Sequence, residues 1–445
     1  MLYSMLSPHR ILLIGFISII ALGAFLLTLP QANSSGSPQS FIDALFIATS
    51  AVSTTGLSVV DIGNFYSLFG QVVVLVLVQI GGLGYMIFIG LVMYTFGIKL
   101  SLSGKLMLGE SLSSPPYEEV VHFSKIVIFV TFAFELVGAA ILSIYWTNEY
   151  PAKHAIYLGI FHSVSAFCTA GFSLFPNNFC AYRDNILVNT TIEILCIGGG
   201  LGFFVIYNIY DTFFRKAREG EPPKRLLAHT KLVLIIFPIL LMMGALLIYV
   251  SECFTSETFV KDRILISLFQ VTSASTTTGF NTLDIGTMRI PELTMMILLM
   301  YIGASPGGTG GGVKTTSFGV LISSVISVIS MNDELVLFNR HISSKIRDRA
   351  LAICVLALML IMVDVMILSI TERASFLGVV FESVSAFGTV GLSTGVTPSL
   401  SFVGKIVIIT TMFIGRVGPL AIGYSIRGKC KLTPIKYPEG TILVG

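Results

Sequence analysis

One short pattern occurs four times in this chain and limits its fold more than any other feature. The pattern is F-x-x-x-S-A-x-x-T-x-G-[LF]-[SN], and its copies begin at Phe46, Phe161, Phe269 and Phe381. The copies align without gaps, and the glycine of the pattern recurs about every 110 residues. Repetition at a fixed period indicates several copies of one structural unit.

The composition places these units in a membrane. Hydrophobic residues make up 54% of the chain and charged residues 11%, with a mean hydropathy of +0.88. Soluble domains carry about 25% charged residues. A membrane-spanning helix needs about 20 apolar residues. Eight apolar stretches approach or exceed that length: 11–29, 69–95, 125–145, 188–210, 230–250, 291–329, 350–370 and 402–425.

Each copy of the pattern lies between an odd-numbered stretch and the next even-numbered one. Its own apolar segment is too short to cross a bilayer and fits a re-entrant helix. We therefore predict an all-α membrane protein with four pseudo-repeated span–pore loop–span units around one central pore. It would have eight spans and four re-entrant pore helices. The predicted units are 11–95, 125–214, 228–329 and 350–425, followed by a C-terminal tail at 426–445.

The distribution of Lys and Arg predicts the orientation. If both termini lie on one side, that side carries 18 basic residues and the other carries 7. The positive-inside rule then places both termini in the cytoplasm, in the cytoplasmic (inner) membrane, with the re-entrant segments entering from outside. We interpret the first apolar stretch as a retained span. A net charge of +3 is too mild to indicate a nucleic-acid partner.

The T-x-G segments carry the predicted function. Irregular backbone at membrane depth is tolerated only where it is buried in protein or lines a water-filled path. Four such segments around one axis would present rings of carbonyl oxygens that replace the hydration shell of K⁺. The negative end of each short helix would point at the ion. The predicted filter residues are Ser53, Thr54, Thr55, Gly56, Cys168, Thr169, Ala170, Gly171, Thr276, Thr277, Thr278, Gly279, Gly388, Thr389, Val390 and Gly391.

The four-fold pattern resembles the superfamily of K⁺ transporters that includes the Trk, Ktr and plant HKT proteins. The chain is most similar to the KtrB-type membrane subunits. The resemblance implies a homodimer with one pore per chain, gated by a cytoplasmic nucleotide-binding (RCK) ring of KtrA-type subunits. Any nucleotide would bind to that partner. Gly56 in the first filter implies a preference for K⁺ over Na⁺, and Na⁺ is implied as a stimulating ion.

A second motif interrupts the sixth apolar stretch. Residues 303–316 read GASPGGTGGGVKTT, which cannot remain a regular helix. In Ktr-like proteins the corresponding segment is an intramembrane loop that blocks the pore below the filter. Arg416, in the last stretch, resembles an arginine that lies near the pore in the family. The predicted gate comprises Gly307, Gly308, Thr309, Gly310, Gly311, Gly312, Lys314 and Arg416.

Several charged residues leave alternatives open. Glu135, Glu193 and Asp364 lie within predicted spans and are candidate partners of Arg416, although helix packing explains each of them as simply. Asp61 and Asp284 follow the first and third filters. They would either concentrate cations at the mouth or form ordinary loop ends. The basic loop at 215–225 is explained by topology, or by binding to anionic lipid or to the ring.

Two other classes of protein compete with this interpretation. A membrane enzyme would need a nucleophile–base set or clustered metal ligands, and the six His and six Cys residues are scattered. We predict that the chain is not an enzyme and binds no metal other than transported K⁺. An ion-coupled secondary Na⁺/K⁺ transporter is the closer alternative. Such transporters often use inverted repeats, whereas every unit here begins on the cytoplasmic side.

Overall fold

The computed structural model describes residues 8–84, 120–213, 225–253, 260–331 and 334–427. These residues are mostly helical, which confirms the predicted all-α class. Their only strands are β1 (Val336–Leu337) and β2 (Arg340–His341), which form a small antiparallel hairpin. The end of the predicted second span and nearly all of the tail at 426–445 lie outside the described residues.

Each repeat contains a first helix, a short pore helix and a second helix. The first helices are α1 (Pro8–Thr28), α7 (Val120–Trp146), α11 (Ala228–Cys253) and α15 (Ser344–Thr371). The pore helices are α2 (Phe41–Val52), α8 (Ala152–Phe167), α12 (Val260–Ser275) and α16 (Phe376–Gly388). The second helices are α4 (Leu68–Leu83), α9 (Ile186–Gly200), α13 (Ile290–Ile302) and α17 (Phe402–Val417).

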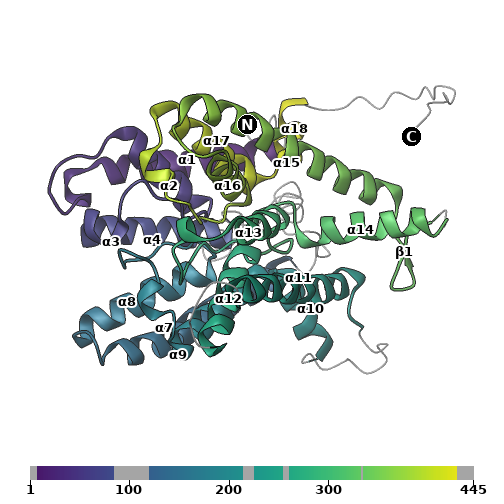
Figure 1. Cartoon of the computed structure of the whole chain (residues 1–445), viewed down its shortest axis with the longest axis horizontal. Helices are drawn as coiled ribbons and strands as arrows, with labels where there is room; N and C mark the ends of the chain where they lie inside the picture. The colour runs from purple at the N-terminus through teal and green to yellow at the C-terminus, as the bar shows by residue number, and fades with distance from the viewer. Residues whose placement is uncertain (1–7, 85–119, 214–224, 254–259, 332–333, 428–445) are drawn as a thin grey trace.

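The remaining elements connect or follow these helices. The outer loops hold α3 (Ile62–Phe65) and short 3₁₀ turns, whereas α10 (Phe203–Phe213), α14 (Thr315–Ile329) and α18 (Pro419–Arg427) follow second helices. The turns are η2 (Pro30–Ala32), η3 (Cys180–Tyr182), η4 (Ile285–Thr287) and η5 (Thr397–Ser399). Helix α14 and the β hairpin project from the right of the molecule in Figure 1.

Side-chain caps define where several of these helices begin. The hydroxyl of Ser40 accepts a hydrogen bond from the third residue of α2, and Ser375 does the same for α16. Ser67 and Ser401 cap α4 and α17 in the same way. A cap of this kind satisfies one of the backbone N–H groups that a helix start leaves without a partner.

The four repeats are arranged as a ring. The second helix of each repeat packs against the pore helix of the next: α4 against α8, α9 against α12, α13 against α16, and α17 against α2. The last contact joins the end of the chain to its beginning. Figure 1 accordingly shows the first (purple) and last (yellow-green) repeats side by side. The same contact in all four repeats means that the units are parallel, not inverted.

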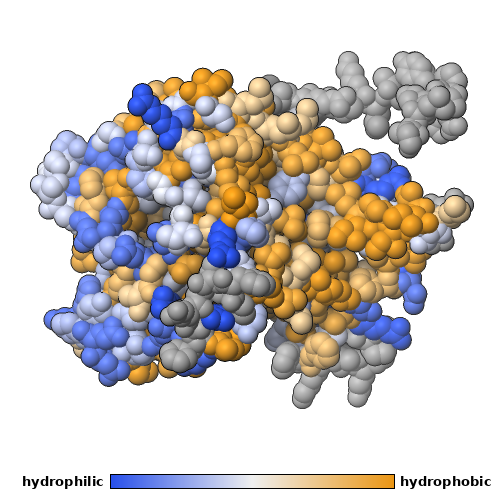
Figure 2. All heavy atoms as spheres, viewed as in Figure 1, coloured by the Kyte–Doolittle hydropathy of each residue, from blue (hydrophilic) through white to orange (hydrophobic). Residues whose placement is uncertain are grey.

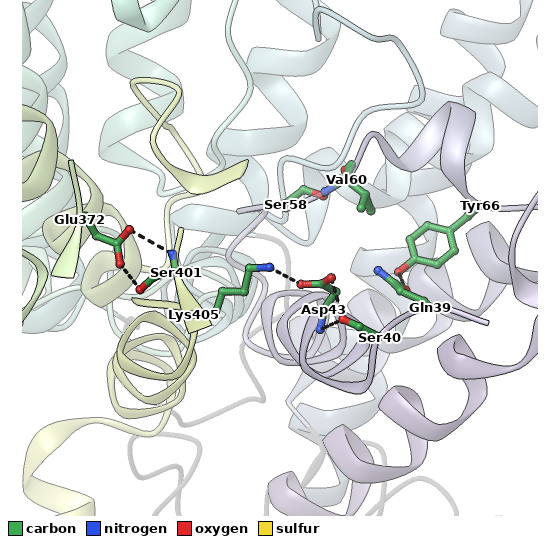
Figure 3. A network of polar contacts seen from close by, with 9 residues as sticks. All are labelled: Gln39, Ser40, Asp43, Ser58, Val60, Tyr66, Glu372, Ser401 and Lys405. Carbon is green, nitrogen blue, oxygen red and sulfur yellow. Dashed lines mark hydrogen bonds and ion pairs between the residues drawn. The ribbon is translucent and has the colours of Figure 1, made fainter. Parts of the chain in front are cut away.

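An ion pair reinforces the junction between the last repeat and the first. Lys405 of α17 donates to Asp43 of α2 over 2.6 Å, and both side chains are mostly shielded from solvent (Figure 3). In the same view Glu372 accepts from the backbone N–H and the hydroxyl of Ser401 at the start of α17. These contacts fasten the start of α17 to α2 and to the end of α15.

We expect the Lys405–Asp43 pair to stabilise the closed ring measurably. Lys405→Gln and Asp43→Asn should each lower the melting temperature of the detergent-solubilised protein. A double-mutant cycle should give a coupling energy of about 1 kcal/mol, because the pair is partly desolvated. Additive losses in the double variant would show that the two side chains do not interact.

The outer faces of the helices are suited to lipid. Phe129 of α7 and Met242 of α11 are more than 70% exposed, although both are large and apolar. Figure 2 shows apolar atoms over α14 and its neighbours, and polar atoms gathered at the opposite end, near α3 and the turn between α7 and α8. Three described helices, within α7, α11 and α15, are long and apolar enough to cross a membrane, or four if the bent pair α9 and α10 counts as one span.

The prediction of continuous fourth and eighth spans was wrong. The stretch 188–210 bends by 90° between α9 and α10, and 402–425 is interrupted between α17 and α18. A glycine with positive φ follows each of the four second helices, directly or after one residue, and this conformation costs glycine little. These glycines are Gly84, Gly202, Gly303 and Gly418, with φ values of 73°, 92°, 71° and 92°. Only the break at Gly303 was predicted.

Candidate functional site

The four T-x-G segments have the same backbone conformation. Each threonine that follows a pore helix is left-handed, with φ between 49° and 57°: Thr54, Thr169, Thr277 and Thr389. The glycine two residues later also has positive φ: Gly56, Gly171, Gly279 and Gly391. The residue between them donates its N–H to the backbone carbonyl of the pore-helix serine of the pattern, as Thr55 does to Ser50 at 2.8 Å. One short sequence pattern therefore produces the same turn four times.

The glycines bring the four segments into a closed ring of contacts. A β-carbon added at Gly56 would overlap the carbonyl oxygen of Ala170, and one added at Gly171 would overlap that of Thr278. The same relation joins Gly279 to Val390, and Gly391 returns to Thr55. Each filter carbonyl thus lies against the glycine of the preceding repeat, and only glycine leaves room for it.

An open cavity of about 620 Å³ lies immediately outside this ring, and all four filter glycines line it. Asp284 lines the cavity and also caps a 3₁₀ turn through the N–H of Gly286 at 2.9 Å. Asp61 is not among the lining residues. It caps α3 by accepting from Gly63 and Asn64. The geometry therefore keeps Asp284 as a candidate for attracting cations and explains Asp61 as a helix cap.

The side chains beside the filter follow a two-fold pattern. Ser53 and Thr55 pair their hydroxyls at 2.6 Å in the first repeat, as Thr276 and Thr278 do at 2.7 Å in the third. The second and fourth repeats have no such pair, because they carry Cys168 with Ala170 and Gly388 with Val390. Repeats one and three lie diagonally across the ring, so the two hydroxyl pairs lie on opposite sides of it.

The glycine-rich loop at 303–316 lies directly against the helix-side end of the filter. Thr309 accepts through its carbonyl from the hydroxyl of Thr54 at 3.0 Å, and its own hydroxyl pairs with that of Thr169 at 2.9 Å. The N–H of Gly311 donates to the hydroxyl of Thr277 at 3.1 Å. A β-carbon at Gly311 would overlap the hydroxyl oxygen of Thr389. The loop therefore contacts a threonine from every repeat.

The bend between α9 and α10 holds one side of this loop. The carbonyls of Gly199 and Gly200 accept from the N–H groups of Thr309 and Ser305 at 3.1 and 3.0 Å, and Phe203 donates to Gly307 at 3.0 Å. Gly202 lies so close to the carbonyl of Pro306 that a β-carbon there would come within 2.5 Å of it. The break in the fourth span, which we did not predict, thus forms the surface on which the loop packs.

Two cations hold the other side of the loop. Arg416 donates to the carbonyls of Thr309 and Gly81, and so connects the loop to α4 and α17. The ammonium of Lys314 donates to the carbonyl of Gly310 at 2.5 Å. Gly308 packs within the same segment, where a β-carbon would lie 2.8 Å from the carbonyl of Gly199. All the residues of the predicted gate therefore belong to one cluster below the filter.

The structure pairs Arg416 with none of the three candidate acids, Glu135, Glu193 and Asp364. Glu135 accepts from Gln79 at 3.3 Å and from the thiol of Cys168 at 3.7 Å, and Asp364 accepts from Thr411 at 2.7 Å. One carboxylate oxygen of Glu193 is buried without a partner among the described residues. No ion pair within the described residues includes Arg416, so backbone carbonyls, not acids, accept from this guanidinium.

One position near the filter was overlooked in the sequence. The residue directly after the phenylalanine of the pattern is His162, Gln270 or Glu382 in the last three repeats, and each side chain is fully or almost fully buried. The repeated pattern leaves this position unspecified, so none of the three residues is among the predicted filter or gate residues. The available signal was a polar residue at one register of three aligned pore helices.

Comparisons with known proteins agree with this architecture. A family model described as "Cation transport protein" (TrkH) matches residues 14–426. The "Ktr system potassium uptake protein B" of Bacillus subtilis is 39% identical over 99% of this chain and 97% of its own length. The "Potassium/sodium uptake protein NtpJ" of Enterococcus hirae is 34% identical over 99% of this chain and 98% of its own length.

A solved structure supports the fold independently. The potassium transporter TrkH from Vibrio parahaemolyticus matches with a TM-score of 0.67 at 19% identity, covering 94% of this chain and 85% of that one. At that identity the match concerns the fold alone. The family model and the full-length relatives decide the assignment: the chain belongs to the TrkH family of cation transport proteins and is a multi-pass membrane transporter, not an enzyme.

Proposed function

We propose that this protein takes up K⁺ across the cytoplasmic membrane through a channel-like pore. The observation that carries the proposal is the closed ring in which each filter carbonyl lies against the glycine of the preceding repeat. Carbonyl oxygens at such a constriction can replace the water around a dehydrated K⁺ ion. The names of the relatives, which include potassium uptake proteins, support K⁺ as the transported ion.

The pore helices add an electrostatic contribution. All four end at the filter segments, so the negative ends of their dipoles face the proposed ion path. The last-turn carbonyls accept from the filter N–H groups, as Ser165 does from Ala170 at 2.8 Å. These bonds hold the filter strands beside the helix ends without any side-chain charge. The proposed filter consists of the sixteen residues named from the sequence.

The glycine-rich loop and its two cations form the proposed gate. Thr309 and Gly311 contact all four filter threonines, so ions cannot pass while the loop remains there. The positive charges of Arg416 and Lys314 would also repel a cation arriving from the filter. We propose that the loop moves aside when a cytoplasmic nucleotide-binding ring of KtrA-type subunits engages a homodimer of this chain, with both termini cytoplasmic. Na⁺ would stimulate uptake.

Complementation of a K⁺-uptake-deficient strain tests this function. The protein should restore growth at low K⁺, and more strongly when a KtrA-type subunit is co-expressed. Failure to grow in either case, with the protein present in the membrane, would contradict K⁺ uptake. Growth that is independent of the partner would contradict only the proposed control by the ring.

An ion-coupled Na⁺/K⁺ transporter remains the second candidate, because one full-length relative is named for both ions. The two mechanisms differ in their driving force. In proteoliposomes, a channel-like pore should admit K⁺ under an inside-negative voltage with no Na⁺ present. A strict requirement for a Na⁺ gradient would favour coupled transport.

A further inference from the structure

The residue that follows the pattern phenylalanine occupies the same place on all four pore helices. It is Ile47, His162, Gln270 and Glu382 in the four repeats, and none of these side chains is more than 1% exposed. Burial of three polar side chains at one register is costly unless each has hydrogen-bond partners.

The second repeat shows what this position does. His162 Nε2 accepts from the backbone N–H of Leu174 at 3.2 Å and lies 3.2 Å from the hydroxyl of Ser173. Its Nδ1 lies 2.8 Å from the carbonyl of Leu158 in its own helix, which fits the tautomer with the proton on Nδ1. Leu174 is the third residue after filter glycine Gly171. The imidazole therefore ties the outer continuation of the filter strand to the pore helix behind it.

The third repeat has the same connection, made by an amide. With its oxygen turned toward the loop, Gln270 accepts from the N–H groups of Thr282 and Leu283, each at 3.0 Å. Thr282 is again the third residue after the filter glycine, here Gly279. A different side chain therefore binds the equivalent amide.

In the fourth repeat the same connection between pore helix and loop includes the most hydrogen bonds. Glu382 accepts from the N–H of Thr394 at 3.2 Å, the third residue after Gly391. It also accepts from the hydroxyls of Ser393 at 2.5 Å and Thr397 at 2.7 Å. All these donors belong to the loop just outside the filter.

The first repeat lacks the connection. Ile47 has no polar group. The loop after this filter segment is instead held by a hydrogen-bonded side chain within the loop, that of Ser58. Ser58 donates to the carbonyl of Val60 and accepts from the N–H of that residue at 3.3 Å (Figure 3). Three of the four filter strands are therefore fastened to their pore helices by a side chain, and one is not.

We propose that His162, Gln270 and Glu382 are positioning residues that set the ion selectivity of the pore. By holding the amide three residues beyond each filter glycine, they fix where the glycine and its neighbouring carbonyls stand around the ion. K⁺ and Na⁺ differ in size, so loosening the outer end of a strand lets the carbonyls close on the smaller ion. The proposal deepens the K⁺-uptake function above and rests on it.

Exchanging residues between repeats provides a sharp test. Glu382→Ile and His162→Ile introduce the residue of the first repeat, whereas His162→Gln introduces that of the third. Ser383→Ala is the matched control, because Ser383 is buried beside Glu382 and bonds only to Val379 of its own helix, at 2.9 Å, among the described residues. The purified proteins are reconstituted into liposomes together with a KtrA-type subunit, and the initial K⁺ and Na⁺ influx rates are measured separately under an inside-negative voltage.

The two isoleucine variants should lower the K⁺/Na⁺ influx ratio about tenfold, the size expected for losing a buried hydrogen bond. His162→Gln and Ser383→Ala should leave the ratio within about twofold, because the connection is kept or untouched. The proposal is overturned if the isoleucine variants keep the original ratio, or if Ser383→Ala lowers it equally. If Glu382→Ile does not fold, the comparison of His162→Ile with His162→Gln tests the proposal alone. An unchanged protein that admits no K⁺ even with the KtrA-type subunit present would instead refute the proposed function.

Discussion

Replacing Gly279 with serine should reduce K⁺ influx by a factor of about 10 to 100, because displacing a carbonyl of the proposed ion site by about 1–3 kcal/mol of strain has an effect of that size. The φ of Gly279 is +89°, and a β-carbon there would overlap the carbonyl oxygen of Val390. The overlap displaces a carbonyl of the proposed ion site in the neighbouring repeat. Influx into proteoliposomes, normalised to reconstituted protein, measures the effect.

Gly36→Ser separates backbone strain from the overlap. Gly36 also has positive φ, +69°, but lies in an exposed outer turn where nothing would meet an added β-carbon within 4 Å. This variant should keep its K⁺ influx. If Gly279→Ser conducts K⁺ as well as the unchanged protein does, the ring of glycine–carbonyl contacts is not the ion path.

Deleting Gly310, Gly311 and Gly312 should raise K⁺ flux at least tenfold in the absence of any partner protein, since a shift of about 1.4 kcal/mol toward the open state suffices for that change. The deletion removes the N–H of Gly311 that binds Thr277, and it removes the carbonyl of Gly310 that accepts from Lys314. Passive K⁺ flux into liposomes holding the purified protein is the measurement.

A second variant shows whether the added flux uses the proposed pore. Combining the loop deletion with Gly279→Ser should remove most of the K⁺ flux that the deletion alone produces. Flux that persists in the combined variant would come from a leak elsewhere in a damaged protein. Flux that never rises in the deletion variant would mean that the loop does not close the path.

The repeated short helix and T-x-G turn were predictable because their signal is local and occurs four times. The gap-free pattern predicts a short helix and a glycine-containing T-x-G segment in each repeat, and the structure gives all four segments the same backbone conformation. The left-handed threonine within each segment was not predicted. A single T-x-G would not have distinguished this turn from an ordinary helix end.

The breaks after the second helices were harder to predict. Each depends on one glycine in an apolar stretch, as at Gly202, and the distance from the filter glycine differs between repeats. At Gly202 the bend lies against the carbonyl of Pro306, which comes from a distant part of the chain. Apolar periodicity contains no information about that contact.

The partners of Arg416 could not be predicted for a related reason. Sequence reasoning favours acidic side chains as partners for a buried cation. The guanidinium instead donates to the carbonyls of Thr309 and Gly81, which become available only where the gate loop and the end of α4 meet. Every residue carries a carbonyl, so the sequence cannot indicate which ones a fold leaves free.

Locating the permeant ion tests the central claim most directly. A crystal structure of the protein in Rb⁺, which scatters anomalously and resembles K⁺ in size, should show a peak on the axis of the ring. It should lie among the carbonyl oxygens of Thr55, Ala170, Thr278 and Val390. Bound Rb⁺ found only elsewhere in the protein, with that ring empty, would contradict the account.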